Sequence, residues 1–163
     1  MAHWKGEYGI QENRKQGGIL LESDAARAAL VSDELLKRVI EFHGHLDPLL
    51  VLGLKAGLLA NSLLGKDCFK TKAIVVTDPN PPDSGLVDGI QFVTGCTMGK
   101  GNISLRTGNY TSVIFIKEGK ILRLTLGEGV LDSIRNAISE QESETVALDL
   151  LRKPVSELFK VEE

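Results

Sequence analysis

The chain has 163 residues, which suits one domain of ordinary size, and we expect residues 1–163 to form a single domain. Hydrophobic residues make up 42% and charged residues 25% of the sequence, so a normal core can form without disulfides. The net charge of −3 and the aromatic content of 5% argue against nucleic acid as a partner, because such binding needs a basic face or stacking side chains.

The first forty residues predict an irregular segment followed by one helix. Residues 1–18 carry mixed charge, end in two glycines and begin without the pattern of a signal peptide. A helix is expected from Asp24 or Ser32 to Phe42, and Ser32 is a suitable N-cap for it. Because the chain has only two cysteines, without close spacing, we expect a cytoplasmic protein.

A long apolar run predicts a second helix, from Pro48 to near Gly65. Asp47 is its expected N-cap, and proline occupies the first helical position, where it is well tolerated. The run is too short for a membrane span and is interrupted by Lys55 and Asn61. We therefore expect a buried helix and no contact with a membrane.

The middle of the chain predicts a strand, a loop, a helix and a second loop. Residues 72–77 are rich in Ile and Val, which favours a buried strand. Residues 78–85 contain three prolines and predict a stiff loop. A short helix is expected over residues 86–94, and a glycine-rich loop over residues 95–101.

Three further strands are expected after the glycine-rich loop, and Glu118-Gly119 predicts a hairpin turn between the last two. These strands cover residues 102–106, 111–117 and 121–126. The C-terminal segment, residues 127–163, is expected to be helical over 130–138 and 145–152, with 140–144 as a polar connection. The order of elements predicts an α+β protein, with helices packed on a mixed, mainly antiparallel sheet rather than alternating βαβ units.

Two histidines and an aspartate gather in one short stretch, at His43, His45 and Asp47. Imidazole nitrogens and a carboxylate are ordinary ligands for zinc and other divalent transition metals. Gly44 lets the chain leave the helix, so that two rings one residue apart can converge. The plainer alternative is that Asp47 is only a helix cap and that each histidine bonds to a backbone carbonyl.

Cys96 is a candidate for the same site. A thiolate is a strong ligand for zinc, and a thiol is also a nucleophile if a histidine or a helix end lowers its pKa. The alternative is a small buried thiol, which is the commoner role of a lone intracellular cysteine.

The glycine-rich loop differs from a phosphate-binding loop, because its glycine spacing is one residue short and Gly101 replaces the required Ser or Thr. Its backbone N–H groups, with Thr97, Lys100 and Asn102, could still hold an anionic or carbonyl-bearing ligand. The alternative is a tight turn into the next strand.

Asp88 and Gln91 lie three residues apart in the short helix, and therefore on one face of it. They could line a ligand pocket or orient a metal ligand. The alternative is an ordinary polar surface of the helix.

Three blocks of the sequence together resemble the formylmethanofuran dehydrogenase E-subunit family. The blocks are Phe42-His43-Gly44-His45 with Pro48, Asp88-Gly89-Ile90-Gln91, and residues 94–102, and the likeness covers about residues 35–126. The resemblance implies the GAPDH-domain-like fold of that family. It also implies that the protein binds a metal ion, usually zinc, and that it assembles as a homodimer. It also implies a redox enzyme containing molybdenum or tungsten as a partner.

The sequence departs from the family pattern at two positions. Asp47 stands where family members carry a cysteine after the His-Gly-His motif, and Gly85 stands at a second family cysteine position. We therefore expect the metal ligands to be His43, His45, Asp47 and Cys96. The alternative is an auxiliary module that binds a small ligand or docks on a redox enzyme, with a degraded metal site.

Overall fold

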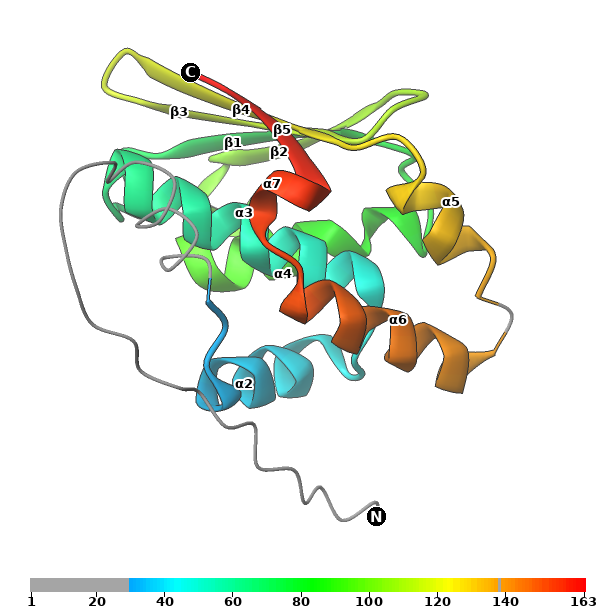
Figure 1. Cartoon of the computed structure of the whole chain (residues 1–163). Helices are drawn as coiled ribbons and strands as arrows, with labels where there is room; N and C mark the ends of the chain where they lie inside the picture. Colours follow the sequence, from blue (N-terminus) through cyan, green and yellow to red (C-terminus); the bar gives the residue numbers. More distant parts are fainter. Residues whose placement is uncertain (1–29, 138) are drawn as a thin grey trace, which may run out of the picture.

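The computed structural model describes residues 30–137 and 139–163 as a five-stranded mixed sheet with its helices on one face (Figure 1). The strand order is β2-β1-β3-β4-β5, and of the four strand pairs only β1 with β2 is parallel. The predicted α+β class and mainly antiparallel sheet are thereby confirmed. The expectations for residues 1–18, for a helix start at Asp24 and for Ile138 lie outside the described residues.

The elements follow the sequence in a simple order. The strands are β1 Lys72–Thr77, β2 Ile103–Thr107, β3 Ser112–Lys117, β4 Lys120–Leu126 and β5 Phe159–Glu162. The helices are α2 Asp33–His43, α3 Pro48–Leu64, α4 Leu86–Thr94, α5 Val130–Arg135, α6 Glu140–Arg152 and α7 Val155–Leu158. Short 3-10 turns cover Asp83–Gly85 and Met98–Lys100.

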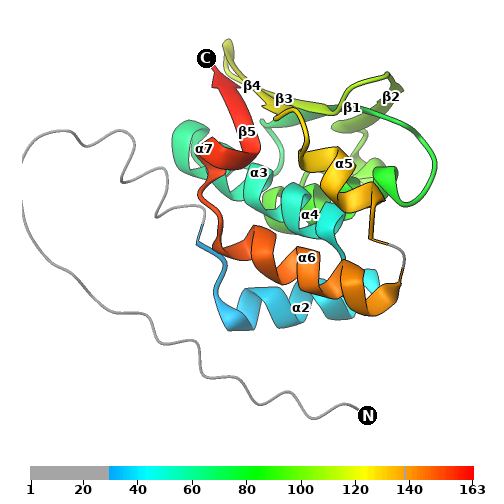
Figure 2. The ribbon, with the colours of Figure 1, turned by 45° about the vertical axis from the view of Figure 1, so that its right-hand side comes forward.

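Helix α3 is the centre of the molecule. It lies between the sheet and the outer helices α2 and α6 (Figures 1 and 2), and twelve of its residues are buried. Helix α4 packs closely along it, because a side chain at Gly53 would overlap the carbonyl of Leu86 and one at Gly89 would overlap the carbonyl of Leu50. The predicted buried helix is confirmed, and none of the described helices is long and apolar enough to cross a membrane.

The sheet is apolar on the side that faces α3. Five side chains on this side alternate along neighbouring strands and are fully buried: Val75, Val113, Phe115, Leu122 and Leu124. This period of two is what a strand with one covered face requires.

The β1–α4–β2 segment supplies the parallel pair of the predicted mixed sheet. A parallel pair needs a crossover, and α4 supplies it, so one βαβ unit lies within the otherwise antiparallel sheet. Glu118 and Gly119 form the predicted hairpin turn, with φ of 49° and 82°.

The C-terminal region differs most from the sequence-based expectation. Residues 140–144 are not a connection but the first turns of α6, because Ser139 and Glu142 form a capping box that starts the helix there. Strand β5, which pairs antiparallel with β4, was not predicted at all. A four-residue strand after Pro154 carries too short an alternation to be recognised.

Candidate metal centre

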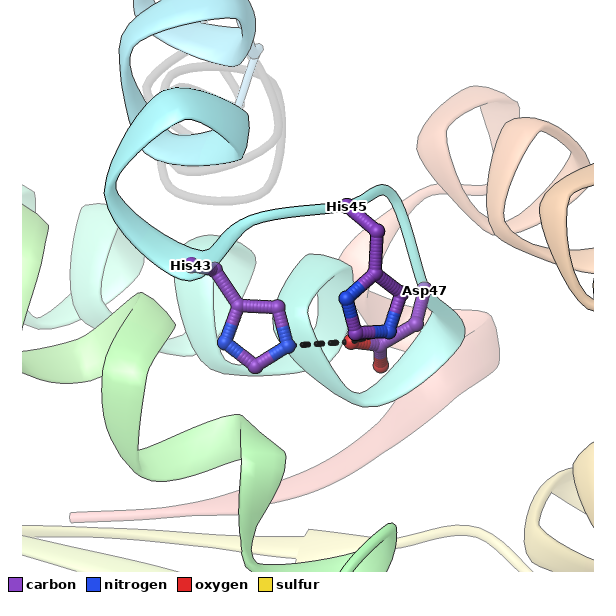
Figure 3. A group of neighbouring side chains, drawn as sticks. All are labelled: His43, His45 and Asp47. Atoms are coloured by element: carbon purple, nitrogen blue, oxygen red, sulfur yellow. Dashed lines mark ion pairs between the residues drawn. The ribbon is translucent and has the colours of Figure 1, made fainter.

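The two histidines lie on either side of a helix end. Helix α2 stops at His43 because Gly44 takes a left-handed conformation, with φ of 107°, and donates its N–H to the carbonyl of Ile40. The chain then turns back, so that the ring centroids of His43 and His45 are 4.8 Å apart (Figure 3). Gly44 thus permits the convergence that the spacing alone only suggested.

Asp47 has two roles, one for each carboxylate oxygen. Its Oδ1 accepts hydrogen bonds from the N–H groups of Leu49 and Leu50, at 2.8 and 3.0 Å, and so caps helix α3. Its Oδ2 lies 2.7 Å from Nε2 of His43 and 3.5 Å from Nε2 of His45 (Figure 3). The cap therefore holds the carboxylate in place without using the oxygen that faces the histidines.

Among the described residues, His43, His45 and Asp47 form a group whose ligand atoms all lie within 4.8 Å of one another. Ligands of a tetrahedral zinc ion stand about 3.4 Å apart, given metal–ligand distances of about 2.1 Å. The separation of His45 from Asp47 already fits this value, and that of His43 from Asp47 must widen by about 0.7 Å. The donor set and its spacing thus suit one metal ion.

Asp88 and Gln91 extend the group into helix α4. Nδ1 of His43 donates to Oδ2 of Asp88 at 2.7 Å, although 45 residues separate them. Nε2 of Gln91 lies 3.4 Å from Oδ1 of Asp88, and Oε1 of Gln91 accepts the N–H of Met98 at 2.9 Å. His43 is therefore held between a carboxylate at the start of α3 and one on α4.

The group opens into a cleft of about 1140 Å³. The side chains of His43 and Asp47 are 12% and 11% exposed, whereas that of His45 is 67% exposed, so the group is open on the His45 side. The proline-rich residues 78–85 line the cleft together with Arg135, whose guanidinium donates to the buried Asp83 at 2.6 Å. The sequence offered no signal for Arg135, which reaches the cleft from the separate helix α5.

The family model described as "FmdE, Molybdenum formylmethanofuran dehydrogenase operon" matches residues 42–160, which include the histidine group, the cleft loop and strands β1 to β4. The chain belongs to this family. The resemblance inferred from the three sequence blocks is thereby confirmed.

One curated relative adds a second comparison. A protein of Archaeoglobus fulgidus named "Probable S-adenosyl-L-methionine-binding protein" is 29% identical to this FmdE-family chain over 127 residues. The alignment covers 76% of the chain and 34% of the relative. The chain thus spans about a third of the length of that protein.

The structure does not bring Cys96 into the histidine group. Its side chain is fully buried beyond the C-terminal end of α4, and its Sγ donates to the carbonyl of Thr71 at 3.4 Å. Burial raises the pKa of the Cys96 thiol, which favours the protonated form. In this member of the FmdE family, the expected pairing of Cys96 with the histidines gives way to the plainer alternative of a buried thiol.

The glycine-rich loop uses most of its own hydrogen-bond donors. The N–H groups of Gly95, Cys96, Thr97, Met98 and Lys100 donate to other groups of the chain. They form no open anion site, because their hydrogen atoms are already engaged. The loop serves instead as a closed turn.

Three of the predicted ligand-binding residues stabilise this turn. Lys100 Nζ donates to the hydroxyl of Thr97 at 2.9 Å, and Asn102 Nδ2 donates to the carbonyls of Cys68 and Thr71. Of the five residues expected to bind a ligand, Asp88 and Gln91 line the cleft, whereas Thr97, Lys100 and Asn102 hold the turn.

Proposed function

We propose that this FmdE-family protein binds one divalent transition-metal ion, zinc in the first instance, with His43, His45 and Asp47 as ligands. The observation that carries the proposal is the position of His43, with Nδ1 on a carboxylate and Nε2 facing the other two donors. Histidines that bind metals commonly donate their second ring nitrogen to a carboxylate in this way.

The open side of the group favours a reactive site over a structural one. Three protein ligands leave a fourth position of a tetrahedral ion free, and structural zinc sites usually fill all four. His43, His45 and Asp47 would hold the ion, and the chemistry it would supply there is polarisation of a carbonyl or activation of water. The chain itself supplies a fixed carboxylate at Asp47, which borders the cleft in which a carbonyl-bearing ligand would lie.

Metal content tests this proposal directly. Wild-type protein, purified without a tag and reconstituted with zinc, should hold about one ion per chain by elemental analysis. His43→Ala and Asp47→Asn should each lose it, because each removes one of three ligands. Cys96→Ala is the matched control and should keep the ion, since the thiol lies in the core. A wild type that holds no metal after reconstitution would contradict the proposal.

A second candidate function is the binding of S-adenosylmethionine in the cleft. The name of the Archaeoglobus relative suggests it, and the exposed carboxylate of Asp78 in the cleft lining suits a sulfonium cation. Calorimetry with S-adenosylmethionine and the uncharged S-adenosylhomocysteine would test it. Preference for the charged compound would support this candidate, and no binding of either would remove it.

Assembly is a separate part of the proposal. We retain a cytoplasmic homodimer, with docking on a redox enzyme as the alternative role, which the family description favours. The outer face of the sheet is available for contact, because all the described helices lie on the other face (Figure 2). Sedimentation of the purified protein would test the dimer, and co-purification with a molybdenum or tungsten oxidoreductase would test the docking role.

A further inference from the structure

The hydrogen bonds around His43 form a chain that starts at the protein backbone. The Met98 N–H can only donate, so the Gln91 side chain must present Oε1 to it and Nε2 to Asp88. Asp88, in turn, has one oxygen facing Gln91 and the other bonded to Nδ1 of His43. The orientation of the imidazole thus depends on a turn of backbone outside the metal-binding group.

Asp88 approaches the edge of the His43 ring that does not face the other ligands. Nδ1 meets Asp88, whereas Nε2 meets Asp47, and the two ring nitrogens point in different directions. Asp88 is also not a member of the three-residue group that could share one ion. It therefore cannot bind the same ion through the geometry observed, and its contact with the site passes through His43.

The helices that carry the two carboxylates are fixed relative to each other. Asp47 caps α3, Asp88 lies in the first turn of α4, and the glycines at positions 53 and 89 allow the two helices to touch along their backbones. A ring that bonds to both carboxylates has little freedom to rotate. A metal ligand held in this way needs less ordering when an ion binds.

We infer that Asp88 and Gln91 are positioning residues for His43: Asp88 fixes the proton on Nδ1 and leaves Nε2 to bind the metal, and Gln91 fixes Asp88. This inference rests on the proposed metal site and deepens it. The sequence led us to expect that Asp88 and Gln91 bind a ligand directly. In this inference they act on the metal through His43 instead.

Zinc affinity of the full chain, measured by competition with a chelating dye, tests the inference. Asp88→Ala should weaken binding about 10- to 100-fold without changing the stoichiometry, which is the usual effect of losing such a partner. Gln91→Met should weaken it less, because Asp88 remains. Asp78→Asn is the matched control, because the Asp78 carboxylate lies in the same cleft but does not bond to the histidines. This substitution should change the zinc affinity less than about twofold.

A measurement on metal-free protein separates this inference from the proposed function. The hydrogen-bonded Nδ1–H of His43 should give a protected proton resonance in the NMR spectrum. It should disappear in Asp88→Ala, broaden in Gln91→Met and persist in Asp78→Asn. Equal zinc affinities for Asp88→Ala and Asp78→Asn, or an unchanged resonance in Asp88→Ala, would overturn the positioning role. A wild type that shows the resonance but binds no zinc would contradict the proposed function alone.

Discussion

Asp47 shows how one residue can serve the fold and the site together. Its Oδ1 closes the start of α3, and its Oδ2 faces the two histidines. The helix cap and the metal ligand, which the sequence presented as alternatives, are therefore compatible. The carboxylate is pre-oriented by backbone N–H groups that the helix must satisfy in any case.

Gly85 is the second position at which the chain departs from the family pattern, and it borders the same group. A Cβ atom there would lie 3.7 Å from Cε1 of His43 and 3.8 Å from Oδ1 of Asp47, which are ordinary contacts. Its φ of −60° is open to any residue. A side chain at this position would lie next to His43 and Asp47, two members of the candidate metal-binding group.

Gly85→Cys is therefore expected to add a thiolate ligand and to raise zinc affinity. With cobalt in place of zinc, the variant should gain a sulfur-to-metal absorption band that the wild type lacks. Ser84→Cys, one residue earlier in the chain, is the control and should show no such band. Unchanged affinity and spectrum in Gly85→Cys would contradict the proposed location of the ion.

Lys55 is a charged residue in the most apolar helix. Its ammonium group is buried and donates to the carbonyls of Leu150, Leu151 and Lys153 at the end of α6. Burial lowers the pKa of Lys55 to about 8, from 10.5. The residue that argued against a membrane span thus joins α3 to the C-terminal end of α6.

This pKa predicts a pH dependence of stability. Between about pH 8 and pH 10.5 the unfolded chain holds a proton at Lys55 that the folded chain has released. The free energy of unfolding therefore rises with pH in this window, and the wild type should gain stability relative to Lys55→Met. Urea unfolding of both proteins at pH 7, 8, 9 and 10 measures the difference. The exposed Lys66→Met is the control, and a difference that does not change with pH would refute this assignment.

At the scale of elements, contact between α3 and α4 decides the site. These helices carry Asp47 and Asp88, and their backbones meet at glycines. Glycine in the interior of a helix costs about 1 kcal/mol relative to alanine, so its presence at positions 53 and 89 reflects close packing rather than helix preference.

Gly53→Ala should destabilise the protein by about 3 kcal/mol, because its methyl group would overlap the carbonyl of Leu86 and overpacking outweighs the gain in helix propensity. Gly99→Ala should change stability by less than about 0.5 kcal/mol, since no atom lies within 4 Å of the added group. Thermal or urea unfolding of the two variants compares them. Equal stabilities would mean that α4 can move away from α3 at little cost.

Considered as a whole, the molecule has its candidate metal-binding group where the ends of three elements meet. The C-terminus of α2, the N-terminus of α3 and the first turn of α4 meet there. An ion bound among them would join helices from two layers. Binding to the folded state alone stabilises that state by mass action.

Zinc at about 100 times its dissociation constant should therefore stabilise the wild type by about 2.7 kcal/mol. For a chain of this size, this corresponds to a rise in the melting temperature of about 5 to 10 °C. Differential scanning calorimetry measures the shift, and a chelator should reverse it. His43→Ala should show no shift, and neither should wild type with magnesium, which prefers oxygen ligands.

The sequence by itself determined the local features of this protein. The caps at Ser32 and Asp47, the bounds of α4 and the turn at Glu118 depend on residues at most a few positions apart, and their prediction was accurate. The His-x-His spacing and its aspartate likewise lie within five residues, so the candidate group was recognisable before any fold was known.

Only the tertiary structure decided which distant residues join that group. It placed Asp88 beside His43 through the packing of α4 on α3, and it kept Cys96 in the core at the far end of α4. Sequence patterns report the face and the ends of one element, whereas contacts between elements depend on how side chains fill the space between them. For the same reason strand β5 could not be predicted from its short sequence. The strand is stabilised by its pairing with β4, which only the tertiary structure shows.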